Sequence, residues 1–177
     1  MSPSTADLNT TSAHGEDLWA AVAAVPDPEM PPLTIEDLGM LRSIEADDGG
    51  AVTVVITPTY SGCPAVEYIE DQIVEALAAT GVAPEAVTVR RELAPAWSTD
   101  WITDAGRAKL AASGISPPRS ARTGSVPGET PVRLGPIICP RCGSSTTSEI
   151  SRFGSTACKA LYRCLDCSEP FDHVKEL

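Results

Sequence analysis

Four of the six cysteines form two Cys-x-x-Cys pairs, Cys139 with Cys142 and Cys164 with Cys167, which are separated by 21 residues. Four thiolates at this spacing can enclose Zn²⁺ in a tetrahedral site, each tight turn supplying two ligands. The intervening residues are enough for a β-hairpin, so the sequence predicts a zinc ribbon. A segment of about 40 residues buries too little surface to fold alone, and the metal is expected to supply folding free energy. Two disulfides are the alternative, which an intracellular chain disfavours.

Two further residues of this region do not fit the paired pattern. Cys158 is expected to be a small buried strand residue, and a second metal or cluster ligand is the alternative. His173 is expected at the surface. A closed four-cysteine site leaves no open position for chemistry, so the ribbon is predicted to be a structural or docking module. Its few basic residues are scattered among acidic ones, so no binding of nucleic acid is expected.

The remaining cysteine, Cys63, precedes Pro64, a residue favoured in the first turn of a helix. A thiolate at a helix N-terminus faces the positive end of the helix dipole, which lowers its pKa. Position 69 holds Ile where a phosphatase-like nucleophile would need Arg. Position 66 holds Val where a thioredoxin-like pair would need a second Cys. No histidine lies nearby, so Cys63 is predicted to coordinate a soft metal or cluster, with an inert buried thiol as the alternative.

Four other side chains are candidates to support such a site. Asp27 and Glu29 lie in a proline-rich loop, where rigid carboxylates could orient a partner or a metal; a solvated loop is equally compatible. Thr57 and Thr59 end a predicted strand just before Cys63, and their hydroxyl groups could donate hydrogen bonds to thiolate or sulfide. Trp97 and Trp101 are expected to be packing residues or a lid.

These candidates need a scaffold, and the hydrophobic pattern predicts one. Alternating apolar residues on either side of Asp47-Asp48-Gly49-Gly50 indicate a hairpin, and apolar residues at helical spacing follow Pro64. The predicted order is α-β-β-α-β-α, a small α+β sandwich whose mixed sheet is covered on one face by helices. The predicted helices span about 16–25, 64–80 and 103–113, and the strands about 38–46, 51–58 and 86–93.

Composition divides the chain into parts. Residues 1–118 carry 18 acidic and 5 basic side chains, whereas residues 119–177 carry 6 acidic and 8 basic ones. We expect a disordered tail over 1–15, the α+β domain over 16–113, a Pro- and Gly-rich linker over 114–136 and the ribbon over 137–177. No apolar run approaches the roughly 20 residues that cross a bilayer, and the N-terminus lacks a secretory signal pattern. A cytoplasmic protein without membrane partners is therefore expected.

In combination, several motifs resemble the small metal–sulfur cluster biosynthesis domain of SufT and its relatives. They are Asp27-Pro28-Glu29-Met30-Pro31, Leu38-Gly39-Met40, the run from Thr57 to Pro64, and Ala96-Trp97-Ser98. The ribbon, with its run from Phe153 to Cys164, resembles one branch of that family, the PaaD or PaaJ proteins of bacterial aerobic phenylacetate degradation.

The resemblance implies an assembly or maturation factor for an iron–sulfur protein, not an enzyme. The implied client belongs to the multicomponent oxygenase that epoxidises phenylacetyl-CoA, and its iron–sulfur reductase component is the expected partner. Cys63 would bind iron–sulfur species transiently, and the ribbon would dock the client. One thiolate cannot hold a cluster alone, so a homodimer, a client or carrier thiol, or a small thiol is required. The alternative is a non-catalytic adaptor within the oxygenase, with an inert Cys63.

Overall fold

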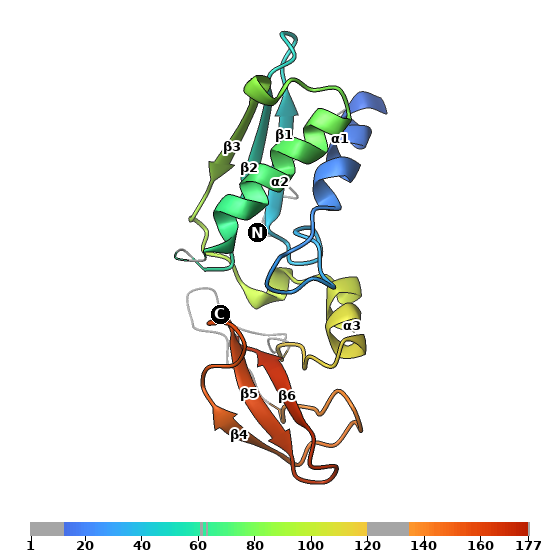
Figure 1. Cartoon of the computed structure of the whole chain (residues 1–177), viewed down its shortest axis with the longest axis vertical. Helices are drawn as coiled ribbons and strands as arrows, with labels where there is room; N and C mark the ends of the chain where they lie inside the picture. Colours follow the sequence, from blue (N-terminus) through green and yellow to red (C-terminus); the bar gives the residue numbers. More distant parts are fainter. Residues whose placement is uncertain (1–12, 61, 63, 120–134, 177) are drawn as a thin grey trace, which may run out of the picture.

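The computed structural model describes residues 13–60, 62, 64–119 and 135–176, and it contains two three-stranded sheets. Figure 1 shows the first sheet with its helices above and the second sheet below, next to α3. The helices are α1 (Ala13–Ala23), α2 (Ala65–Ala79) and α3 (Asp104–Ala112), and two short 3₁₀ turns span Pro84–Ala86 and Thr99–Trp101. The strands are β1 (Leu41–Ala46), β2 (Val52–Ile56), β3 (Val87–Arg91), β4 (Thr147–Ser151), β5 (Lys159–Cys164) and β6 (Pro170–Val174).

The first sheet is mixed, as predicted, because β2 pairs antiparallel with β1 and parallel with β3. The hairpin turn between β1 and β2 is stabilised by Asp47, whose Oδ1 accepts hydrogen bonds from the backbone N–H of Gly49 and Ala51. The parallel pair needs a crossover, which α2 supplies. Figure 1 shows α1 and α2 packed side by side over one face of this sheet, so the predicted α+β sandwich is confirmed.

Helix α2 supplies the centre of the core. Its apolar residues recur at helical spacing and are buried, whereas the acidic residues Glu67 and Asp71 are exposed. The predicted limits of the helices and strands agree with the structure to within about three residues, and the largest differences are the start of β1 at Leu41 and the start of α1 at Ala13. The buried residues of α2 are Ala65, Val66, Ile69, Ile73 and Leu77.

The second sheet is an antiparallel ribbon in the order β4-β5-β6 that packs against the first body. Val174 of β6 is 3% exposed and belongs to the main hydrophobic core, and Cys158 packs against the same core. Within the segment predicted as a linker, Ser116 forms a parallel bridge to His173 and exchanges two backbone hydrogen bonds with β6. The ribbon is therefore attached to the first body by apolar packing and by backbone pairing.

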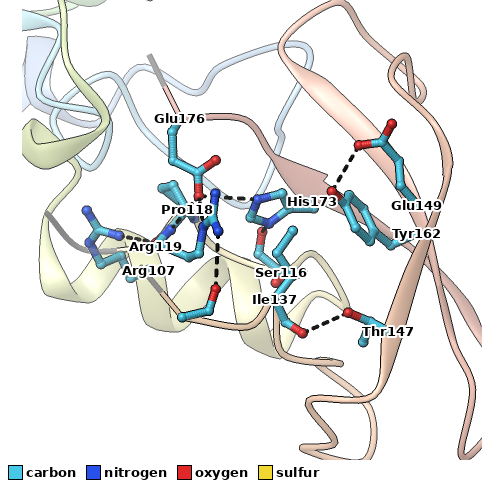
Figure 2. A network of polar contacts seen from close by, with 11 residues as sticks. Arg107, Ser116, Pro118, Arg119, Ile137, Thr147, Glu149, Tyr162, His173 and Glu176 are labelled. Atoms are coloured by element: carbon cyan, nitrogen blue, oxygen red, sulfur yellow. Dashed lines mark hydrogen bonds and ion pairs between the residues drawn. The ribbon is translucent and has the colours of Figure 1, made fainter. Parts of the chain in front are cut away.

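His173 is buried, with 2% of its surface exposed, so the expectation of a surface position was wrong. Figure 2 shows its ring between two partners. Nδ1 donates to the carbonyl oxygen of Ser116 at 3.2 Å, and Nε2 lies 3.6 Å from a carboxylate oxygen of Glu176. The same Glu176 oxygen accepts hydrogen bonds from the backbone N–H and the Nε of Arg119, so one carboxylate connects the end of β6 to the segment after α3.

None of the described helices is long and apolar enough to cross a bilayer.

Truncating the core through Ile73→Ala should destabilise the protein strongly. Ile73 is fully buried, and removing its branched side chain leaves a cavity that costs about 2–5 kcal/mol. Urea denaturation followed by far-ultraviolet circular dichroism measures the free energy of unfolding. The control is Tyr68→Ala on the same helix, because Tyr68 is 50% exposed. Equal losses in the two variants would contradict the assignment of Ile73 to the core.

Glu176 should make stability depend on pH. Burial alone would raise the pKa of its carboxyl group, but the contacts with His173 and Arg119 outweigh burial and hold the pKa well below its usual range. The carboxylate therefore stabilises the fold above the unfolded-state pKa of about 4.3, and the stabilisation is lost as the pH falls toward the lower folded-state pKa.

In Glu176→Gln, the loss in free energy of unfolding relative to wild type should be largest near neutral pH and should shrink below about pH 4. Denaturation series at several pH values give this difference. Glu85→Gln, at an exposed site, is the control and should show no such trend. A constant difference between Glu176→Gln and wild type across the series would refute the linkage.

Candidate functional site

The two Cys-x-x-Cys turns bring four thiols together at one end of the ribbon. Their sulfur atoms all lie within 4.8 Å of one another. The Sγ atoms of Cys139 and Cys167 are 3.8 Å apart, and those of Cys142 and Cys164 are 3.5 Å apart. Cys139 and Cys164 are buried, while Cys142 and Cys167 are exposed. The group therefore lies at the surface, with two ligands rooted in the small core of the ribbon.

The local backbone supports thiolates at this centre. The backbone N–H of Cys167 donates to Cys164 Sγ at 3.5 Å, and this bond, with a second from the N–H of Asp166, lowers the pKa of Cys164 to about 7. The positive φ of Gly143 lets the first turn reverse directly after Cys142. These turns point N–H groups toward sulfur before any metal is bound.

The sulfur geometry fits a tetrahedral metal. Zn–S bonds of about 2.3 Å at tetrahedral angles place neighbouring sulfur atoms about 3.8 Å apart. The two measured separations, 3.8 and 3.5 Å, agree with that value within a few tenths of an ångström. All four ligands are thiolates, so the centre suits a soft divalent cation held for structure, and Zn²⁺ would supply charge neutralisation and cross-linking of the two turns.

The acidic loop lies where the first body meets the other end of the ribbon. Asp27 is 5% exposed, and its Oδ1 accepts hydrogen bonds from the backbone N–H of Glu29 and Met30, both at 2.8 Å. Burial raises the pKa of Asp27, while these two N–H groups and the nearby Lys159 partly offset the rise. Glu29 is half-buried. The loop therefore holds one carboxylate rigidly, as its prolines suggested.

Thr57 and Thr59 follow β2 and line a cavity of about 310 Å³ with Tyr60, Leu93 and Trp97. Thr57 is 3% exposed, and Thr59 is half-buried. Trp97 is 7% exposed, and its Nε1 donates to the carbonyl oxygen of Leu38 at 2.8 Å, so Trp97 forms a packed wall of the cavity. The cavity is next in sequence to Cys63, which lies outside the described residues.

Among the described residues, the structure brings the four ribbon cysteines together, and it brings Asp27 and Glu29 close to Lys159 and Cys158. No described hydrogen bond joins Asp27 to Thr57 or Thr59. Sequence reasoning missed Lys159, whose side-chain nitrogen donates to the carbonyl oxygen of Glu29 at 3.2 Å across 130 residues. Only tertiary packing creates that contact, and no local pattern could have indicated it.

Comparisons with known proteins match both parts of the chain. Residues 15–89 match the family model described as iron–sulfur cluster assembly protein, and residues 127–175 match the PaaD zinc β ribbon domain. A relative from Escherichia coli (strain K12), provisionally named as one of the subunits of 1,2-phenylacetyl-CoA epoxidase, is 48% identical over 90% of this chain and 91% of its own.

Two other similar proteins cover only the first part. An Fe–S protein maturation auxiliary factor from Porphyromonas gingivalis (strain ATCC BAA-308 / W83) is 30% identical over 54% of this chain and 89% of its own length. The crystal structure of a DUF59 domain of unknown function from Bacillus anthracis superposes with a TM-score of 0.50 at 27% identity, covering 55% of this chain and 92% of that chain. The ribbon is thus an addition to a domain that also occurs without it.

Removing the metal should unfold the ribbon. The buried cluster of the ribbon's own core contains only Cys139, Cys164 and Phe171, which is too small to hold three strands without a cross-link. Cys164→Ser should therefore lose the single bound zinc, measured by mass spectrometry of the native protein, and lose amide protection in β4 and β5. Cys158→Ser is the matched control and should keep one zinc. Full zinc content in Cys164→Ser would contradict the four-thiolate site.

Proposed function

Because this chain belongs to the PaaD family and combines an iron–sulfur cluster assembly domain with a zinc β ribbon, we propose that it is an accessory factor for iron–sulfur protein maturation. The observation that carries the proposal is the similarity along nearly the whole chain to a protein named as part of the epoxidase, together with that of residues 15–89 to the assembly family. The protein acts on another protein and has no substrate turnover of its own.

The reacting centre is assigned to the first domain. A four-thiolate site is closed and has no free coordination position, so the ribbon centre is structural. Cys63, which immediately precedes the N-cap Pro64 of α2, is proposed as the thiolate that binds the cluster. The α2 helix has 15 residues, and the dipole at its N-terminus favours a nearby anion.

Supporting roles go to the acidic loop and the strand end. Asp27 and Glu29 would shape the site and bind iron through carboxylate oxygen. Thr57 and Thr59 would donate hydroxyl hydrogen bonds to sulfide or thiolate from the wall of the cavity after β2. A cluster usually has four protein ligands, so the proposal requires a second thiol from a homodimer or from the client.

The proposed client is the iron–sulfur reductase component of the phenylacetyl-CoA epoxidase system, in the cytoplasm. The ribbon offers a surface for such a client, because Ile138 and Leu165, next to the metal ligands, are 43% and 58% exposed. Exposed apolar side chains grouped around a rigid centre are typical of protein–protein contacts. Nucleic acid is a poor partner for a chain with a net charge of −11.

One observation favours the alternative function of a non-catalytic adaptor with an inert Cys63. The ribbon shares its apolar packing with the first domain through Val174, which makes the two parts one firm body suited to bridging other proteins. The adaptor requires no cargo at Cys63, and that difference separates the two functions.

Cys63→Ser should abolish cargo binding while leaving the zinc centre intact. Iron and acid-labile sulfide are measured per chain after anaerobic purification, and client activity is measured after mixing with apo-client. Wild type should hold zinc, iron and sulfide, and Cys63→Ser should hold only zinc and fail to activate the client. Zinc alone in both proteins, with equal client activity, would favour the adaptor.

A further inference from the structure

A group of buried polar side chains lies where the ribbon meets the acidic loop, and neither the zinc centre nor Cys63 accounts for it. Lys159, the first residue of β5, is 4% exposed, and its Nζ donates to the carbonyl oxygen of Glu29 at 3.2 Å. The carboxylate of Asp172 is 4.0 Å away from the same nitrogen. An ammonium group this deeply buried is costly unless negative charge or acceptors surround it.

Cys158 precedes Lys159 and is the one described cysteine outside the four-thiolate centre. Its side chain packs against the core of the first domain, and Thr156 Oγ1 lies 3.0 Å from its Sγ. The charges of Glu29, Asp27 and Lys159 all act on this thiol. A sulfur atom that can ligate metal is thus held at the contact between two parts of the chain that lie far apart in sequence.

The second observation concerns Asp27. The residue is only 5% exposed, yet the hydrogen bonds that its carboxylate accepts from Glu29 and Met30 both end on Oδ1. Within the described part of the chain, Oδ2 has no hydrogen-bond donor. A carboxylate oxygen on a side chain this deeply buried rarely lacks a donor in a folded protein, and a bound cation is one way to satisfy it.

The electrostatic balance indicates what such a cation would be. Burial raises the pKa of the Cys158 thiol, the Thr156 hydroxyl lowers it, and the carboxylates of Glu29 and Asp27 raise it further. Without a cation the thiol keeps its proton and is unreactive. A soft divalent metal displaces that proton to solvent, and the thiolate, the Asp27 carboxylate and the Lys159 ammonium then form a nearly charge-balanced set around it.

We propose that Cys158 and Asp27 form a second ligand pair, in which ribbon and acidic loop together bind the iron of the iron–sulfur cargo, with Lys159 compensating the negative charge of the sulfide-bearing species. The identity of the cargo rests on the proposed function, whereas the metal-binding pair does not. Binding forms an iron–sulfur bond and an iron–oxygen bond and releases the Cys158 proton to solvent, and no oxidant or reductant is needed. The remaining iron ligands come from sulfide and from thiols of the cargo's donor or recipient.

The test uses the full-length chain with zinc in its ribbon, under anaerobic conditions, and Co²⁺ as the probe. Wild type should bind one Co²⁺ in addition to zinc and show the near-ultraviolet thiolate-to-cobalt absorption. Cys158→Ser should lose that absorption, and Asp27→Asn, which keeps the Oδ1 hydrogen bonds, should weaken Co²⁺ binding at least about tenfold. Ala157→Ser, at the exposed neighbouring residue, is the matched control and should bind as wild type does.

Zinc content near one per chain and an unchanged melting temperature in each variant show that the fold survives. The same proteins are then reconstituted with Fe²⁺ and sulfide, alongside Cys63→Ser. Loss of cobalt absorption and of iron in Cys158→Ser supports the inference, whatever Cys63→Ser does. Wild-type cobalt and iron binding in Cys158→Ser overturns it, and loss in Cys63→Ser alone then leaves the proposed function standing. Absence of extra cobalt in wild type also overturns it.

Discussion

Four thiols held within 4.8 Å of one another set the condition on which the rest of the C-terminal structure depends. As thiolates they repel each other strongly in the absence of a cation, and as thiols they make only weak hydrogen bonds. A soft divalent metal converts this repulsion into four bonds, and it joins the turn that precedes β4 to the turn between β5 and β6. The ribbon's own apolar cluster is too small to replace that contribution.

The condition extends into the first domain, because the ribbon donates side chains to it. Val174 fills part of the main core, and Lys159 contacts the loop that holds Asp27. The strand β6 also pairs with Ser116, which follows α3. Metal binding at one end of the ribbon therefore helps to fix a buried carboxylate at the other end, through strands that act as rigid connections rather than through any direct contact.

Local patterns were sufficient for most of the scaffold. The apolar spacing of α2, the Asp-Gly turn between β1 and β2 and the cysteine spacing each have a short-range physical cause, so they could be predicted. The burial of Lys159 and His173 has no such cause, because it arises from packing between segments 130 and 57 residues apart. A lysine or histidine on a short strand looks the same in sequence whether a neighbour covers it or not. For the same reason the candidate site was predicted as a set of residues and not as an arrangement, since nothing indicated that the ribbon would bring Cys158 and the acidic loop to one contact.

The unequal division of charge between the two stacked bodies has a consequence for encounters with other molecules (Figure 1). Residues 1–118 carry a net formal charge of −13, and the rest of the chain carries +2. The two bodies lie one beyond the other along the longest axis, so the protein has a large electric dipole directed along its length. In the field of an acidic partner it rotates before contact so that the ribbon leads, and a basic partner draws the opposite end forward. The order in which the two ends reach a given protein is therefore fixed by long-range forces, and added salt, which shortens their range, randomises it.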